Sequence, residues 1–418
     1  MDEPPARAYA RLMPDANQGS DRPPELPRGD GAANSEAAGA SAAAPVEPES
    51  GATPSMTGDS SPFFPREQAT APNLRFWLIA VGLLGLGALA LGQAELASLA
   101  ILAGLFAAAH AADLHASRRT LYYALAWVVP ALAALLFSGL AVAFTAAALS
   151  AGFRQVGPQA SVTAVGLTTS IFGGLMAVAL AIPRVAHLFA RMLFRAEGTS
   201  HALRLAARLA VIGALLYVPA SLYCHDVIDF AQMLAEKKGA LLGRNSLWGN
   251  LIGQTLLALG GVGFAVRRDT AATLERLGLR QITAPQWALV AVCVLALVAF
   301  NSGAEWLQKS WFPALWESDQ RMTEVIAGGL ARSDALLLGL SAGIGEEITL
   351  RGGLQPRLGI FRTSALFALL HVQYSWYGVL IIFLIGALLG LLRQRTSTSV
   401  AIAVHAIYDT VAVLALKN

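Results

Sequence analysis

The feature that most constrains this chain is a succession of apolar runs, each about 20 residues long, that fills most of the sequence after Phe76. A helical run of this length crosses a hydrocarbon core of about 30 Å, and only helices or closed barrels satisfy their backbone groups there. We therefore expect a polytopic membrane protein. Seven spans are predicted before residue 305, near 76–92, 95–112, 121–148, 160–183, 203–224, 247–266 and 285–304.

Composition excludes a soluble multidomain protein. Charged residues make up 14% of the 418 residues, whereas soluble domains carry about 25%, so too little polar surface is present to cover them. Cys224 and Cys293 are too few for a disulfide framework or a cysteine metal site, and we expect both to pack as small apolar residues. The predicted fold class is all-α, a transmembrane helical bundle of about ten spans and at least eight.

Residues 1–73 have a different character from the rest. They hold twelve of the nineteen prolines, with eleven acidic residues against five arginines. Such a segment buries too little apolar surface to offset its chain entropy, so we expect a disordered tail. Its acidic start at Asp2 and Glu3 does not suit a signal peptide. A disordered tail of this kind can recruit partners, whose identity is unknown.

Arginines in alternate loops predict the orientation of the spans, because basic residues resist translocation. They place the N-terminus in the cytoplasm and residues 74–304 as a scaffold of transmembrane helices. Residues 305–334, with Trp306, Trp311 and Trp316, are expected as an outer aromatic and acidic loop. The loop arginines are Arg66, Arg75, Arg118, Arg119, Arg184, Arg191, Arg195, Arg267, Arg268, Arg276 and Arg280.

Ionisable side chains inside apolar segments distinguish the last region, residues 335–418. Because such residues cost several kcal/mol in a bilayer, they usually face a protein interior or a cavity and carry function. At 1.5 Å per residue from the nearest arginines, the two histidines lie roughly 14 Å from the cytoplasmic side, and Glu346 lies at roughly 8 to 16 Å, which brackets the same depth. The residues concerned are Glu346, Glu347, Arg351, His371, His405 and Asp409.

Helical spacing divides the roles of the two glutamates. Glu347 and Arg351 are four residues apart and share a face, so we expect an ion pair. Glu346 is turned by about 100° from Glu347 and is expected to face the histidines. His405 and Asp409 are also four apart, so the carboxylate can orient the imidazole or stand beside it as a metal ligand.

Three motifs follow one another on these segments: EExxxR at Glu346–Arg351, FxxxH at Phe367–His371 and HxxxD at His405–Asp409. In this order the chain resembles the CPBP family of intramembrane metalloproteases over residues 334–416, a family that includes CAAX prenyl endopeptidases and bacteriocin-processing and immunity proteins. The resemblance implies that Glu346 is catalytic and that His371 and His405 act with it. Asp409 departs from the asparagine of the CAAX-processing members, and an ionised aspartate cannot donate a hydrogen bond to an oxyanion.

The resemblance implies an intramembrane endopeptidase that cuts a peptide or lipidated protein, and two mechanisms remain open. In the first, Glu346 is the general base for a water that His371 helps to hold, while His405 stabilises the oxyanion. In the second, His371, His405 and Asp409 bind Zn²⁺, which activates the water, and Glu346 takes its proton. No HExxH motif is present.

Two non-catalytic alternatives use the same polar cluster: a transporter of protons or ions, and an immunity or scaffold protein. The partners expected are the peptide or lipidated substrate and membrane lipids, without nucleic acid. The expected location is the inner membrane of a bacterium.

Overall fold

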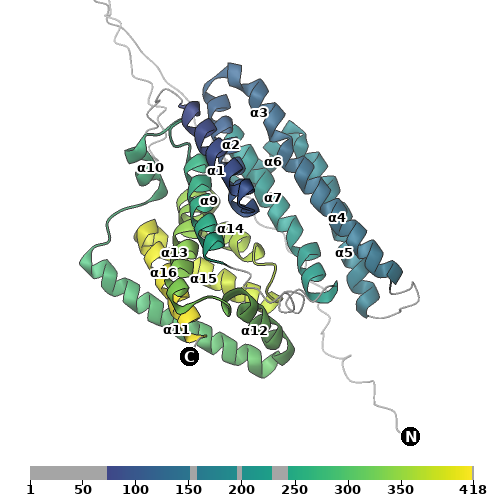
Figure 1. Ribbon diagram of the computed structural model, residues 1–418, viewed down its shortest axis with the longest axis vertical. Coiled ribbons are helices and arrows are strands. Elements are labelled where there is room, and N and C mark those ends of the chain that lie inside the picture. Colours follow the sequence, from purple (N-terminus) through teal and green to yellow (C-terminus); the bar gives the residue numbers. More distant parts are fainter. Residues whose placement is uncertain (1–72, 151–157, 195–199, 228–242, 417–418) are drawn as a thin grey trace, which may run out of the picture. The chain divides into compact units, whose positions relative to one another are not determined.

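The computed structural model describes residues 73–150, 158–194, 200–227 and 243–416, and their regular structure is helical, with no strand (Figure 1). The all-α fold class is confirmed for these residues. The tail expected over residues 1–73 lies outside the described residues up to residue 72.

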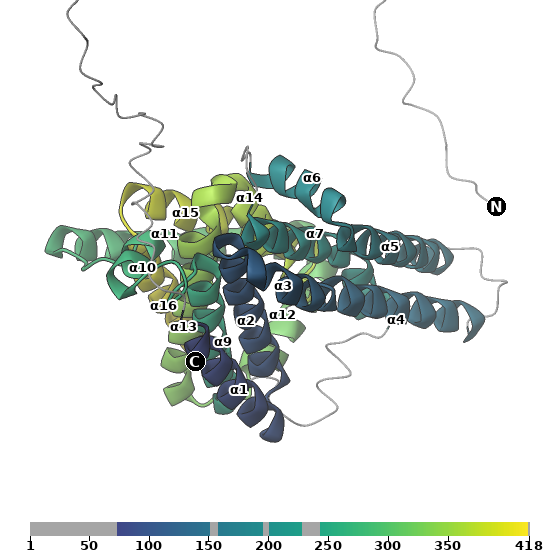
Figure 2. The same cartoon turned by 90° about the horizontal axis from the view of Figure 1, so that it is seen from above.

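The first half of the chain forms paired antiparallel helices. The α4 and α5 helices lie side by side in both views (Figures 1 and 2). A short 3₁₀ turn, η1 (Ala116–Arg118), precedes α3, and a π-helical turn, η2 (Tyr223–Val227), follows α7. The helices are α1 (Leu74–Ala90), α2 (Ala94–Leu114), α3 (Arg119–Ala126), α4 (Val128–Ser150), α5 (Pro158–Ala181), α6 (Pro183–Phe194) and α7 (His201–Leu222).

The second half carries the motif residues. An eight-residue π-helix, η3 (Glu347–Leu354), interrupts the path between two α-helices. The helices are α9 (Arg244–Val262), α10 (Thr270–Leu277), α11 (Ala284–Trp311), α12 (Pro313–Ala327), α13 (Arg332–Glu346), α14 (Gln355–Leu369), α15 (Trp376–Arg395) and α16 (Thr398–Ala415).

Seven helical segments of the described chain are long and apolar enough to cross a membrane, or up to eight if α12 and the Arg332–Leu369 segment, bent by 104°, form one broken span. The protein is an integral membrane protein. The count reaches the expected minimum of eight only with the bent pair and stays below about ten. Two expected spans are not among those that qualify: α1, at 17 residues, is shorter, and α9 carries polar side chains such as Asn250 and Gln254.

The expectation of an outer loop over residues 305–334 needs correction. The end of α11 and the whole of α12 occupy most of this segment, and α13 begins at Arg332. Apolar and charged residues are interspersed along this segment, as in an amphipathic helix. A search for long apolar runs does not detect a helix of that kind. Trp306 and Trp311 remain exposed, as expected of an aromatic belt.

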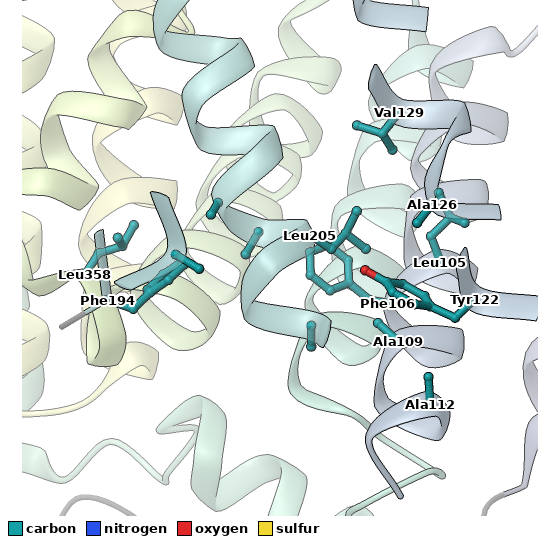
Figure 3. Packing of buried hydrophobic residues seen from close by; sticks show 14 residues of the cluster. Leu105, Phe106, Ala109, Ala112, Tyr122, Ala126, Val129, Phe194, Leu205 and Leu358 are labelled. Atoms are coloured by element: carbon teal, nitrogen blue, oxygen red, sulfur yellow. The ribbon is translucent and has the colours of Figure 1, made fainter. Parts of the chain in front are cut away.

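A core cluster joins the scaffold helices to α14 (Figure 3). Phe106 of α2, Tyr122 of α3 and Leu205 of α7 pack in it together with Leu358 of α14. Alanines on α2, such as Ala109, are fully buried, and small residues of this kind let membrane helices approach closely. The cluster therefore anchors the helix that leads to His371 on the scaffold.

A second close approach fixes α13 against α16. A Cβ atom on Gly343 would lie 2.7 Å from the backbone nitrogen of Ala406 and 2.8 Å from its Cα. Only glycine permits this separation, because backbone atoms cannot rotate away as a side chain can. The contact sets the distance between the helices that carry Glu346 and His405.

We predict that Gly343→Ala lowers the free energy of unfolding by about 1–3 kcal/mol, because the added methyl group pushes α13 from α16. Thermal unfolding of the full chain in detergent micelles measures the effect. Gly82→Ala on α1 is the control, since no atom lies within 4 Å of its added Cβ. Equal melting temperatures for the two variants would contradict the prediction.

Candidate active site

The two glutamates of the first motif lie at a change of helix type. Glu346 ends α13 and Glu347 begins η3. The widened π-helical turns carry Glu347 and Arg351 into the protein interior, where both side chains are fully buried. The Glu346 side chain retains 23% of its accessible surface. One glutamate is thus enclosed while its neighbour faces open space.

The Glu347 carboxylate joins two of the motifs. Its Oε1 atom lies 3.2 Å from Nη1 of Arg351 and 3.0 Å from Nδ1 of His405. Because an ionised carboxylate only accepts hydrogen bonds, Nδ1 of His405 carries the proton. The expected ion pair between Glu347 and Arg351 is present, and the same oxygen also orients the histidine.

The other nitrogen of His405 faces two further carboxylates. Its Nε2 atom lies 3.4 Å from Oδ2 of Asp409 and 3.9 Å from Oε2 of Glu346. An imidazolium satisfies this arrangement, since both of its nitrogens donate to carboxylates. The structure therefore brings Glu346, His405 and Asp409 to one point.

His371 lies just beyond the end of α14. Its Nδ1 atom donates to the carbonyl oxygen of Phe367 at 2.9 Å, which leaves Nε2 free of this contact. The Phe367 ring makes edge contacts with His371 and His405, at centroid distances of 4.8 and 6.4 Å, and lies 4.7 Å from the Arg351 guanidinium carbon. Phe367 thus separates the two histidines and packs against the buried arginine.

A carboxylate from α12 holds the turn that contains His371. The buried Asp319 side chain accepts hydrogen bonds from the backbone nitrogen and hydroxyl of Ser375, both at 2.7 Å, and from the Gln308 amide, also at 2.7 Å. Within the same turn, burial raises the pKa of the Tyr374 phenol, which therefore stays neutral at physiological pH. The turn is fixed at both ends, by Phe367 and by Asp319.

These groups line a cavity of about 1870 Å³. Glu346, His371, His405 and Asp409 all contribute to its wall, and faces of α2 and α9 continue it along the bundle. A cavity of this size accommodates an extended peptide segment. The arrangement can therefore present a carboxylate base and two imidazoles to a peptide bond inside the helical bundle.

A zinc ion in a catalytic site is held by three protein side chains, from Cys, His, Asp or Glu. Within the described part of the chain, no three His, Cys, Asp or Glu side chains are arranged so that they could hold a metal ion. The structure thus offers no complete ligand set for the tentative site at His371, His405 and Asp409. Zn²⁺ stays a prediction, and no step below depends on it.

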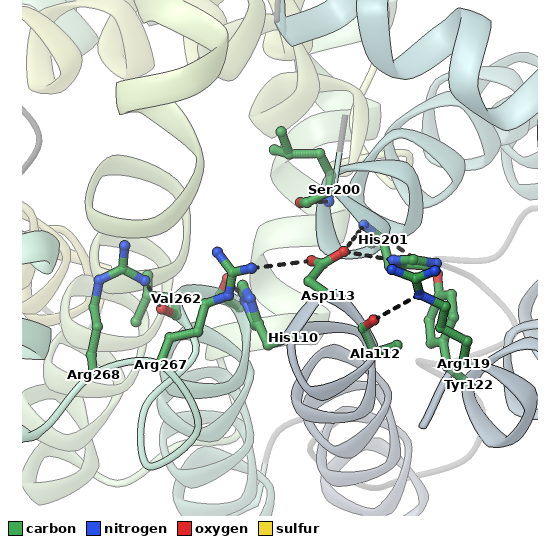
Figure 4. A network of polar contacts seen from close by, with 12 residues as sticks. His110, Ala112, Asp113, Arg119, Tyr122, Ser200, His201, Val262, Arg267 and Arg268 are labelled. Carbon is green, nitrogen blue, oxygen red and sulfur yellow. Dashed lines mark hydrogen bonds and ion pairs between the residues drawn. The ribbon is translucent and has the colours of Figure 1, made fainter. Parts of the chain in front are cut away.

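Two polar networks of the structure were not predicted from the sequence. Asp319 lies in a segment expected to be an outer loop, and no spacing links it to Ser375. A second network, shown in Figure 4, links Oδ1 of Asp113 to Nδ1 of His201 at 2.6 Å, while Arg267 lies 3.7 Å from the other aspartate oxygen. The available signal in the sequence for this second network was the position of Asp113 and His201, each at one end of an apolar run.

The segment that carries the three motifs is similar to a known protein family. Residues 329–411 match the family described as type II CAAX prenyl endopeptidase Rce1-like. The C-terminal region of this chain is Rce1-like. The resemblance to the CPBP family is thereby confirmed for the segment that carries all three motifs.

Outside the Rce1-like region the comparisons are sparse. The chain is 28% identical over 128 residues to the uncharacterized protein YpbD of Bacillus subtilis (strain 168), a match that covers 30% of this chain and 65% of that protein. The chain thus spans slightly less than two thirds of the length of this relative. No solved structure matches the chain.

We predict that Glu347→Leu costs about 3–5 kcal/mol of unfolding free energy, because it leaves the Arg351 charge buried without its partner. The double variant Glu347→Leu, Arg351→Met should recover much of this loss, since it removes both charges. Chemical unfolding in micelles measures both. Asp334→Asn is the control, because its partner Arg244 is 61% exposed and solvent screens the pair, so the loss should stay at about 1 kcal/mol. A double variant no more stable than the single one would contradict the prediction.

A separate prediction concerns the turn of the Rce1-like region that carries His371. Asp319→Asn replaces one accepting oxygen by an amide, so we expect faster hydrogen exchange at the Ser375 backbone nitrogen and a stability loss of about 1.5–3 kcal/mol. Mass spectrometry measures the hydrogen exchange, and chemical unfolding measures the loss of stability. Glu317→Gln, an exposed neighbour on α12, should leave both unchanged. Unchanged exchange in Asp319→Asn would show that the carboxylate does not hold the turn.

Proposed function

We propose that this chain is an intramembrane endopeptidase that hydrolyses a peptide bond of a membrane-associated or lipidated substrate. One observation carries the proposal: the Glu346 carboxylate and both motif histidines line a single cavity within a bundle of apolar helices. The Rce1-like region supports it, because the family described is one of endopeptidases.

The chemistry proposed is the addition of water to a peptide carbonyl. Glu346 takes a proton as the water oxygen attacks the carbonyl carbon, and His371 helps to position that water. The carbon–nitrogen bond then breaks, and the proton on Glu346 passes to the leaving amine. The second hydrogen of the water stays on the acyl product, so the products are one carboxylic acid and one amine, and atoms and charge balance without a further reactant.

His405 has the second role in this proposal. Its Nε2 faces the cavity beside Glu346 and donates to the oxyanion that develops on the carbonyl oxygen. Glu347 holds the ring through Nδ1, and Asp409 stabilises positive charge on it. Asp409, which cannot donate when ionised, thus supports the oxyanion through His405.

The mechanism proposed predicts that Glu346→Gln lowers hydrolysis by at least about 100-fold, since a positioned general base contributes about 10²–10⁴-fold. Cleavage of a peptide library by the full chain in lipid nanodiscs, read by mass spectrometry, measures the effect and the cut sites. The amide is nearly isosteric, so thermal unfolding should change little.

Glu317→Gln, on the exposed face of α12, is the matched control and should cut at the rate of the unaltered protein. Full activity in Glu346→Gln would refute the assignment of the base. A protein that cuts nothing in the library while it moves an ion across a bilayer would instead support the transporter alternative.

A further inference from the structure

The α6 helix has two sides of different character. Ala186, Ala190 and Phe194 are buried against the scaffold, and Phe194 belongs to the core cluster of Figure 3. On the opposite side, Leu188 and Met192 are 56% and 59% exposed. In a membrane protein, a short amphipathic helix with large exposed apolar side chains lies along the bilayer surface, where these side chains enter the acyl layer.

Arginines share the exposed side of α6. Arg184 and Arg191 are both exposed, and their spacing of seven residues places them within about 20° of each other around the helix. Leu188 lies about 40° from Arg184, on the same side. A basic edge therefore runs beside an apolar edge, which suits a helix whose arginines stay at the level of the lipid phosphates.

The α7 helix, which lies beside α6 in both overall views, adds two arginines that are four residues apart (Figures 1 and 2). Arg208 is 5% exposed, and its Nε atom donates to the carbonyl oxygen of Leu180 at 2.9 Å. Within the described part of the chain, Nη1 of Arg208 and Nε of Arg204 are buried without a hydrogen-bond partner. The polar groups beside Arg208 are Arg204, Tyr122 and Tyr123, with no carboxylate among them.

The neighbouring helices supply no compensating charge. The sequences of α5, α6 and α7 contain neither aspartate nor glutamate, and the connection from α6 to α7 adds Arg195 and Glu197, whose charges cancel. Asp113, near the start of α7, contacts His201 at 2.6 Å and Arg267 at 3.7 Å. Like charges one helical turn apart are unfavourable, and a buried charge without a counter-ion more so, which favours an anion from outside the chain.

The expected orientation indicates the source of that anion. The arginines of α6 belong to a connection expected on the cytoplasmic side, where the membrane leaflet is anionic and basic sites between helices bind lipid headgroups. We propose that the exposed side of α6 and the first two turns of α7 bind the phosphate headgroup of an anionic phospholipid, whose acyl chains lie against Leu188 and Met192. This proposal is independent of the proposed peptidase function.

The site is connected to the helix that leads to His371. Phe194 of α6 packs in one cluster with Leu358 of α14, and Arg362 of α14 donates to the carbonyl oxygen of Leu193. A lipid that holds α6 against the scaffold therefore also stabilises the first half of α14.

Lipid retention tests the proposal. The full chain is released from nanodiscs that contain phosphatidylcholine and phosphatidylglycerol in equal amounts, and native mass spectrometry counts the lipids that stay bound. Phosphatidylglycerol should be enriched by at least about 10-fold, the effect of one charge-assisted hydrogen bond. Equal retention of the two lipids would overturn the proposal.

Variants locate the enrichment. Arg204→Gln should lower it by about 10-fold, since it removes a donor to the phosphate. Arg191→Gln changes an exposed side chain without a risk to folding and should lower it by about 5-fold, the contribution of one arginine near an anionic surface. Arg280→Gln is the matched control, because this exposed arginine is expected on the same side of the membrane. Unchanged enrichment in both variants, or an equal loss in the control, would refute the assignment.

Hydrogen exchange distinguishes a lipid from free phosphate. Exchange of residues 183–194, followed by mass spectrometry, should be slower in phosphatidylglycerol nanodiscs than in phosphatidylcholine nanodiscs. Glycerol phosphate added to phosphatidylcholine nanodiscs should leave the exchange unchanged. Equal exchange in the two lipids, or slowing by glycerol phosphate as strong as that by phosphatidylglycerol, would overturn the assignment to a lipid.

Discussion

One carboxylate oxygen, Oε1 of Glu347, holds the Rce1-like region together. It contacts Arg351 within η3 and His405 on α16, and Arg351 in turn donates to the Gly386 carbonyl oxygen of α15 at 3.1 Å. Three segments therefore depend on a single buried charge. In a medium of low dielectric constant, each of these groups is costly alone, so the network forms as a unit. Its rigidity is what gives His405 a fixed orientation beside Glu346.

The π-helix that carries this network needs support from outside the motifs. A widened turn weakens regular backbone hydrogen bonding, and the Gly352 and Gly353 carbonyl oxygens accept from Arg276 at 2.8 and 3.1 Å. Gly352 also lies against the backbone of Leu277, where an added Cβ would meet the carbonyl oxygen at 3.0 Å. Thus α10, which carries no residue of the three motifs, fixes the geometry of η3.

How much could be predicted from the sequence depends on the range of the interaction. Most helices that match long apolar runs were predicted within a few residues, because bilayer thickness dictates their length. The α11 helix instead continues to Trp311, seven residues beyond the expected end, and the span expected over 121–148 is divided into α3 and α4. The Glu347–Arg351 pair followed from local spacing. The Glu347–His405 bond did not, because it depends on a π-helix and on the approach of α13 to α16. The assignment of Glu346 as the base stays a prediction.

Amphipathic elements show the same limit. The α6 helix and much of α12 lack a continuous apolar run, so the sequence offered no span there. Asp319 on α12 nevertheless meets Ser375 at a separation of 56 residues. Such a contact is set by how helices pack, and neither spacing nor composition encodes it locally.

The arginines that follow α9 link the topology of the chain to the packing of its helices. Basic residues in this loop are expected to stay on the cytoplasmic side, because their translocation is costly. Arg268 nevertheless donates inward, to the end of α9, and is 7% exposed. An arginine that served only to set the orientation of the helices in the membrane would be more stable with its guanidinium group in water, because burial removes the hydration of the charge. The inward placement is therefore explained by the end of α9, where Arg268 donates to the carbonyl oxygen of Val262, a group that has no acceptor role within the helix.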